Sequence, residues 1–269
     1  MTKSIALIAL MLTATVSGQQ RPAPIGYDDT PMQPNGKWRV HQTARPYPAV
    51  ITPPPAGGSV APPSDAIVLL GAADDLSAWQ MDDGSAATWA MKGGVLHTGK
   101  GMLRTKYQFT DVQLHVEFAT PSEVKGDSQG RGNSGVFLLG HFEIQVLDSY
   151  RNITYADGQA ASMYGQYPPL VNVARAPGEW QAYDIIFTAP RFAGDGQLAK
   201  PAVVTVLHNG VVVHHATRFW GPTRHRSVLP YTPAMARGPL ALQDHGNPVR
   251  YRNIWIRALR DYDAGGDGW

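Results

Sequence analysis

Apolar and polar residues alternate with a period of two along much of this chain, and this alternation limits the fold more than any other feature. In residues 112–119 every second position is valine, leucine or phenylalanine, and residues 142–147 repeat the pattern with Phe142, Ile144 and Val146. Successive side chains of a strand point to opposite faces of its sheet. Both segments therefore predict a β-strand with one buried face and one wetter face.

A hairpin and further strands extend this pattern. The runs Ala202–His208 and Val211–His215 flank Asn209-Gly210, the dipeptide that best tolerates the positive φ angles of a two-residue type I′ turn. Other predicted strands are Ala66–Leu70, Gly94–His97, Gly135–Leu139, Tyr183–Thr188, Leu240–Asp244 and Tyr251–Leu259. No long stretch combines a helical period with caps. Short strands with polar or Gly/Pro-rich connections predict an all-β fold, an antiparallel sandwich of two sheets.

The N-terminal residues differ from this β region. Lys3 precedes an apolar run that ends at Val16, and small residues follow, so residues 1–18 are typical of a secretory signal peptide. The run is shorter than the ~20 apolar residues that a spanning helix needs, and no membrane span is expected. The chain has no cysteine, so neither a disulfide nor a cysteine-linked lipid anchor is expected. The predicted location is the periplasm or the exterior of the cell.

Proline content separates a second segment. Half of the 22 prolines lie between residues 22 and 63, and proline fixes φ and removes a backbone donor. Residues 19–64, here called the strap, are therefore expected to be extended, without sheet ladders, and partly ordered along the domain surface. Residues 65–260 form the predicted sandwich domain, and residues 261–269, rich in Gly and Asp, are expected to fray.

The charge balance excludes one class of partner. Lys and Arg number 23 against 21 Asp and Glu, a formal charge of +2. This is too balanced to supply the basic footprint of a nucleic-acid-binding protein. We therefore expect no nucleic-acid partner.

Candidate site residues gather where predicted strands begin or end. They are Arg131 and Asn133 before the strand at 135–139, Glu143 and Gln145 on one face of the strand at 142–147, Tyr164 in an aromatic loop, and Gln243, Asp244 and His245 after the strand at 240–244. Polar side chains on the outer faces of adjacent strands converge on one volume where a sheet curves. Taken singly, Glu143 and Gln145 are also typical of a solvated strand face. Arg224 and His225, in a long Pro/Gly loop, are interpreted as solvated surface, with a substrate clamp as the alternative.

The order of several motifs resembles the 3-keto-disaccharide hydrolase domain family over roughly residues 65–259. The motifs are Asp75–Trp79, Gly94–Leu96, Asn133–Leu138, Phe142–Ser149, Tyr164-Gly165, Pro177–Trp180, Leu207–Gly210 and Leu240–Gly246 with Arg252–Ile254. The family's fold is similar to the jelly roll of concanavalin A-like lectins and glucanases. The resemblance therefore implies a two-sheet antiparallel jelly-roll sandwich.

The resemblance implies cleavage of sugars that are already oxidised at carbon 3, so the expected partner is a carbohydrate, a 3-keto-glycoside. A ketone there acidifies the hydrogen on carbon 2, and a base can form an enolate that expels the group on carbon 1 before water adds back. On this basis Glu143 or His245 is the base, and Asp244 orients His245 or serves as the acid. Asn133, Gln145, Gln243 and Tyr164 bind the substrate, and Arg131 neutralises the enolate. No cofactor is required by the pattern, and a divalent metal ion on Glu143 and His245 stays open.

Two other functions remain in view. Jelly-roll endoglucanases carry an E-x-D-x-x-E pattern on one strand. In the three acidic positions of that pattern this chain has Glu143, Gln145 and Asp148. On an unbulged strand Glu143 and Asp148 point to opposite faces, which does not suit double displacement by two neighbouring carboxyls. A lectin or carbohydrate-binding module of the same fold is the non-catalytic alternative, with Tyr164, Tyr167 and Trp220 as stacking platforms.

Overall fold

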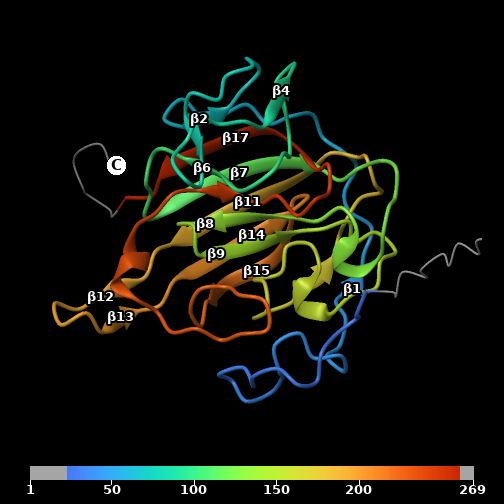
Figure 1. Cartoon of the computed structure of the whole chain (residues 1–269), viewed down its shortest axis with the longest axis vertical. Coiled ribbons are helices and arrows are strands. Elements are labelled where there is room, and N and C mark those ends of the chain that lie inside the picture. Colours follow the sequence, from blue (N-terminus) through green and yellow to red (C-terminus); the bar gives the residue numbers. More distant parts are fainter. Residues whose placement is uncertain (1–22, 261–269) are drawn as a thin grey trace, which may run out of the picture.

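In the computed structural model, which describes residues 23–260, two antiparallel sheets stack face to face (Figure 1). The larger sheet has eight strands in the order β15-β14-β11-β7-β17-β5-β4, and β2 pairs with β17 off this path. Its strands are β2 (Ile67–Leu70), β4 (Ala90–Lys92), β5 (Val95–His97), β7 (Val112–Ala119), β11 (Gln181–Thr188), β14 (Val203–His208), β15 (Val211–Arg218) and β17 (Arg250–Ala258).

The smaller sheet has five strands in the order β3-β6-β16-β8-β9. They are β3 (Trp79–Met81), β6 (Leu103–Thr105), β8 (Ser134–Leu138), β9 (Phe142–Val146) and β16 (Ala241–Leu242). Two short pairs, β1 (Ala49–Val50) with β10 (Val171–Asn172) and β12 (Arg191–Phe192) with β13 (Leu198–Lys200), and the 3₁₀ turns η1 (Ser128–Gly130), η2 (Ala156–Gly158) and η3 (Pro233–Ala236) complete the described elements. The predicted all-β, two-sheet antiparallel jelly-roll sandwich is confirmed.

The core lies between the two sheets, on the apolar face that the alternation predicts. Phe142 of β9 packs against Phe187 of β11 across the interface, with ring centroids 5.7 Å apart. Burial of such a side chain contributes about 1.5–3 kcal/mol. Polar tips of buried aromatics also join the sheets, because the Tyr183 hydroxyl donates to the Gln145 carbonyl at 2.7 Å. This hydrogen bond ties β9 to the larger sheet, and β9 carries the candidate residues Glu143 and Gln145.

The predicted hairpin is confirmed in its turn chemistry. Asn209 and Gly210 join β14 to β15 with φ angles of 53° and 80°. Both values are positive, as a type I′ turn requires.

The expected wetter face of β7 is a wrong prediction, because side chains that point away from the core are also covered. His115 and Glu117 are only 1% and 5% exposed. Glu117 accepts a hydrogen bond from Ser59 of the strap and pairs with Arg252 at 2.6 Å. Burial opposes the charge of His115, but its interactions with the carboxylates of Asp184 and Glu117, which accept from the imidazole, outweigh burial and raise the pKa of this imidazole to about 9. A polar, paired layer therefore lies under the strap.

The described part of the strap follows the domain surface, and one expectation about it is wrong. A ladder was not expected in so proline-rich a segment, yet Ala49 and Val50 pair in parallel with Val171 and Asn172. These two positions lie between prolines, where backbone donors are available. The predicted signal peptide at 1–18 and the predicted tail at 261–269 lie outside the described residues. Within residues 23–260, no helix has the length and apolar character needed to cross a bilayer.

Candidate functional site

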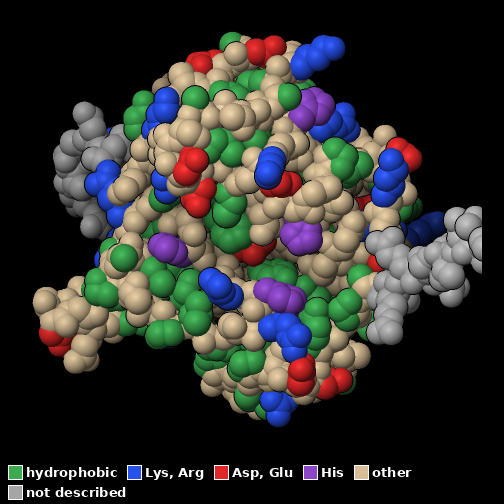
Figure 2. All heavy atoms as spheres, viewed as in Figure 1, with side chains coloured by type: hydrophobic (Ala, Val, Ile, Leu, Met, Phe, Trp, Pro, Cys, Tyr) green, Lys and Arg blue, Asp and Glu red, His purple; other side chains and the backbone are tan. Residues whose placement is uncertain are grey.

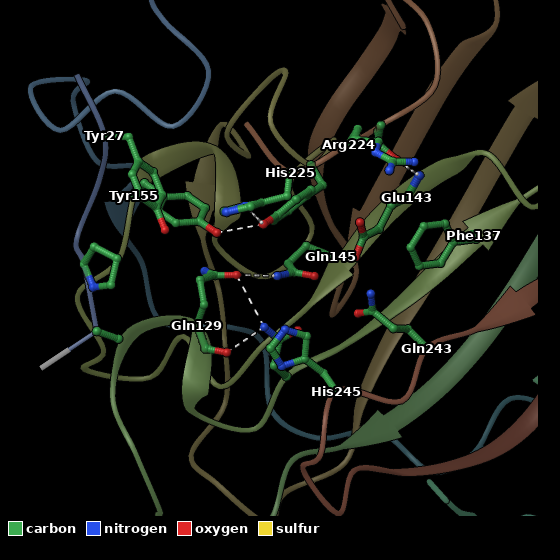
Figure 3. A pocket seen from close by; sticks show the side chains of 15 residues that line it. Tyr27, Gln129, Phe137, Glu143, Gln145, Tyr155, Arg224, His225, Gln243 and His245 are labelled. Atoms are coloured by element: carbon green, nitrogen blue, oxygen red, sulfur yellow. Dashed lines mark hydrogen bonds between the residues drawn. The ribbon is translucent and has the colours of Figure 1, made fainter. Parts of the chain in front are cut away.

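A cavity of about 430 Å³ opens on the outer face of the five-stranded sheet. Figure 2 shows this face, with histidine side chains around a hollow near its centre. Most of the predicted site residues line this pocket, namely Asn133, Glu143, Gln145, Tyr164, Gln243 and His245. They come from β8, β9, β16 and the loops beside them, so the sheet brings together segments far apart in the sequence (Figure 3).

Glu143 is the carboxyl group of the pocket. It is 5% exposed, and burial without a cationic partner raises its pKa to about 8. Of the lining residues in the described chain, it is the one Asp or Glu. At neutral pH this group holds its proton, which suits donation to a leaving oxygen.

Space for the Glu143 carboxyl comes from a missing side chain on the neighbouring strand. Gly135 of β8 pairs with Gln145 of β9 and lies two positions from the Phe137–Glu143 pair, on the same face of the sheet. A Cβ atom on Gly135 would lie 2.5 Å from Glu143 Oε1 and 2.8 Å from Phe137 Cε2. The glycine is therefore needed for the position of the carboxyl group.

Gly135→Ala is expected to lower turnover by about 100-fold, because a misplacement of about 1 Å in a reacting group has effects of this size. The backbone of Gly135 is ordinary strand, so alanine strains no backbone torsion, and the Glu143 and Phe137 side chains must move to make room for its Cβ. Steady-state kinetics with a thermal melt check this. Gly57→Ala, with no atom within 4 Å of its new Cβ, is the matched control. Unchanged kinetics in Gly135→Ala would contradict the role given to this glycine.

An amide cluster lies beside Glu143. The Gln145 amide donates to Gln129 Oε1 at 2.8 Å, and the Asn133 amide donates to the Gln129 carbonyl at 2.7 Å. With its amide turned over, Gln145 instead donates to Glu143 Oε1 at 3.0 Å and to the Ser134 carbonyl at 2.9 Å. The buried Asn133 Oδ1 has no partner. Amide groups of this kind fit the hydroxyls of a sugar ring.

A hydrogen-bonded chain runs from the interior to the pocket. The hydroxyls of Tyr155 and Tyr164 lie 2.7 Å apart, and the Tyr164 hydroxyl is 3.0 Å from His225 Nδ1. Burial, together with the charges of His41, Arg226 and His245, lowers the pKa of His225 to about 4. The His225 imidazole is therefore neutral at physiological pH. Tyr164 positions this ring rather than offering an open stacking face, because it is itself buried.

Two predicted site residues lie elsewhere. The Arg131 guanidinium binds Asp148 at 2.7 Å and the Tyr150 carbonyl at 2.9 Å, and it borders a different cavity. The Asp244 carboxylate accepts from the backbone of Gly101 and Gly246 and does not line the pocket. Asp244 thus shapes the loop that carries His245 through these backbone contacts. The enolate contact expected of Arg131 and the acid role expected of Asp244 are therefore not placed at this pocket, because each side chain is held by local partners.

Residues 65–257 match the family described as 3-keto-alpha-glucoside-1,2-lyase-like domain. The chain belongs to this family. A Parabacteroides distasonis protein named "putative glycosyl hydrolase" has 45% identity and a TM-score of 0.71, over 80% of this chain and 94% of that one. Two others of that name from the same organism have 18% and 23% identity, with TM-scores of 0.55 and 0.52 over 73% and 72% of this chain and 94% and 99% of theirs. They show the same fold.

No match was found among curated proteins. Family membership makes this a carbohydrate-active protein.

Several residues that line the pocket were not indicated by any sequence pattern. Among them are Tyr27, Gln129 and Tyr155. Arg224 and His225 were interpreted as solvated surface, with a substrate clamp as the alternative. Both side chains are exposed, and both also line the pocket, where a clamp would have to lie. Their loop has no periodic pattern, and its mixture of Arg and His was the one available signal. Arg224 is the single Arg or Lys among the described lining residues, so the pocket has a cationic side chain at Arg224 and not at Arg131.

The donor set for a metal ion is incomplete. Within residues 23–260, no group of three or more His, Asp or Glu side chains is arranged to hold one.

Proposed function

We propose that this protein cleaves glycosides whose sugar carries a ketone at carbon 3. Family membership supports the substrate class. The observation that carries the proposal is a pocket in which one buried carboxyl group with a raised pKa shares a cavity with imidazole groups. This combination supplies a proton donor and a proton acceptor without a second carboxylate.

The reaction proceeds by elimination. A base removes the proton from carbon 2, and the electron pair of that bond forms an enolate with the ketone. When the ketone re-forms, the carbon 1–oxygen bond breaks, a double bond forms between carbons 1 and 2, and the leaving oxygen takes a proton. Addition of water, hydrogen to carbon 2 and hydroxyl to carbon 1, completes the net hydrolysis.

Each role has a residue with matching properties. Glu143, protonated at neutral pH, gives its proton to the leaving oxygen, and His245 receives the proton from carbon 2. Arg224 offers positive charge to the enolate oxygen. The amides of Asn133 and Gln145 bind hydroxyls of the oxidised ring. We also propose that the chain is exported, on the strength of its N-terminal sequence.

The two alternatives differ from this arrangement. Double displacement needs two carboxyl groups about 5–5.5 Å apart, but Asp148 is held by Arg131 away from the pocket. For a lectin, two of the three expected platforms, Tyr167 and Trp220, pack against each other at 4.5 Å and do not line the pocket, and the third, Tyr164, lines it but is buried. Both observations favour the elimination.

The experiment follows a 3-keto-glucoside by NMR in D₂O. We expect wild-type protein to release the aglycone and to place deuterium at carbon 2, and His245→Ala to lose most of the exchange. His215→Ala, an exposed histidine on β15, is the matched control. Binding without exchange or cleavage would favour the lectin, and release of reducing sugar from an unoxidised β-glucan would favour the endoglucanase.

A further inference from the structure

Part of the pocket wall comes from a segment that the family match does not include. The match begins at residue 65, yet Ala23, Pro24 and Tyr27 of the strap line the pocket together with Glu143. Figure 3 shows Tyr27 at the far end of the pocket from Glu143, Phe137 and Gln243. The strap therefore closes the side of the pocket away from the carboxyl group.

Two anchors hold this wall in place. Behind it, the fully buried Asp157 accepts hydrogen bonds from His41 Nδ1 at 2.9 Å and from the Arg45 guanidinium at 3.2 Å. In front, the Ser128 hydroxyl donates to the Pro24 carbonyl at 2.9 Å. Buried ionic groups with several hydrogen bonds hold a segment in one arrangement. Tyr27, between the two anchors, is thus part of a preformed surface.

The Tyr27 ring is placed as a platform. The Arg226 guanidinium covers it at 4.4 Å from the centroid, and the His225 ring meets it edge-on at 5.5 Å. The Tyr155 ring lies 6.0 Å away and forms the adjoining wall. The Tyr27 side chain is half-buried, and its hydroxyl makes no hydrogen bond within the described chain. No internal hydrogen bond therefore occupies the tip of the ring, and Tyr27 offers its aromatic surface to the pocket.

We propose that Tyr27 and the strap wall form the subsite for the leaving sugar of a 3-keto-disaccharide. The inference rests on the proposed function: the oxidised ring lies by the amides of Asn133 and Gln145, within reach of Glu143. The second ring then extends toward the strap, where the C–H face of a sugar packs on an aromatic side chain. The strap thereby selects disaccharides over small alkyl glycosides.

The test compares substrates that differ only in the leaving group. The 3-keto forms of trehalose and maltose, and methyl 3-keto-α-glucoside, are assayed with wild type, Tyr27→Ala and Tyr27→Phe. Tyr47→Ala, an exposed tyrosine of the strap outside the pocket, is the matched control. We expect Tyr27→Ala to lower kcat/KM about three- to tenfold on the disaccharides, which corresponds to 0.5–1.5 kcal/mol of aromatic contact. The methyl glucoside should be unaffected, and Tyr27→Phe should behave as wild type.

A binding arm separates this inference from the proposed function. Calorimetric titration with unoxidised trehalose and maltose needs no turnover, and weaker binding by Tyr27→Ala supports the subsite even if no substrate is cleaved. Inactivity of the wild type on all three keto substrates would contradict the proposed function and would leave the subsite to be judged by the titrations. Equal losses on the disaccharides and the methyl glucoside, or titrations in which neither disaccharide distinguishes wild type from Tyr27→Ala, overturn the subsite.

Discussion

Glu143→Gln is expected to lower kcat/KM on a 3-keto-glucoside by about 100- to 10,000-fold, the range for loss of a positioned proton donor or acceptor. Glutamine has nearly the same shape as glutamate but cannot transfer the proton. No other carboxyl among the described pocket residues can replace it. Glu123→Gln, in which a 75% exposed carboxylate is changed, is the matched control and should keep full activity. Wild-type turnover by Glu143→Gln would remove this residue from the mechanism.

The pH profile decides which proton transfer Glu143 performs. Burial raises its pKa to about 8, so the protonated form exists below that pH in the folded protein. As the proton donor, Glu143 predicts that kcat/KM falls as the pH rises through about 8. As the base it predicts the opposite, a rise through the same pH. A measured alkaline rise would therefore transfer the role of base from His245 to Glu143.

Stability gives an independent signature of the same group. A carboxyl whose pKa is raised by folding binds more protons in the folded state than in the unfolded state between about pH 4.5 and pH 8. Its presence therefore lowers stability as the pH rises through that window. Glu143→Gln should melt at a higher temperature than wild type at pH 9, and this advantage should shrink at pH 5. A substitution that only disturbed packing would lower the melting temperature at both pH values.

Period-two alternation predicted the sandwich because it records which face of each strand is buried. It succeeded for the core side of β7 and β9, and the Asn209-Gly210 turn was predictable from local φ preferences alone. It failed for the outer face of β7, where His115 and Glu117 read as wet positions. Their burial depends on a strap more than 50 residues away in the chain, and no local pattern contains that contact.

The site was predictable to the extent that it lies on strands. Glu143 and Gln145 share a face because they are two residues apart on β9, and the structure places both in the pocket. Arg131 was assigned by proximity in sequence, but its ion pair with Asp148 turns it away. Tyr27 and His225 come from loops and the strap, and only the tertiary fold brings them to 5.5 Å.

Asp157→Asn is expected to destabilise the protein by about 3–5 kcal/mol, the effect of breaking a buried ion pair on one side. Burial would raise the pKa of Asp157, but the hydrogen bonds and charges of His41 and Arg45 outweigh it and lower this pKa below its usual range. The substitution leaves Arg45 buried without its counter-charge. Differential scanning calorimetry should record a Tm lower by roughly 10 °C.

The loss of stability in Asp157→Asn should depend on pH as the Asp157 carboxyl group titrates. Because the pKa of Asp157 is lowered by folding, its contribution is present above the unfolded value near 4 and disappears as the pH falls further. The gap between wild type and Asp157→Asn should therefore be constant at neutral pH and narrow only in acid. Asp65→Asn breaks an exposed pair with Arg257 and should leave Tm nearly unchanged.

Since Asp157 holds His41 and Arg45 of the strap, Asp157→Asn should also increase cleavage of the strap by added protease. Equal protection of the strap in wild type and Asp157→Asn would show that other contacts hold it.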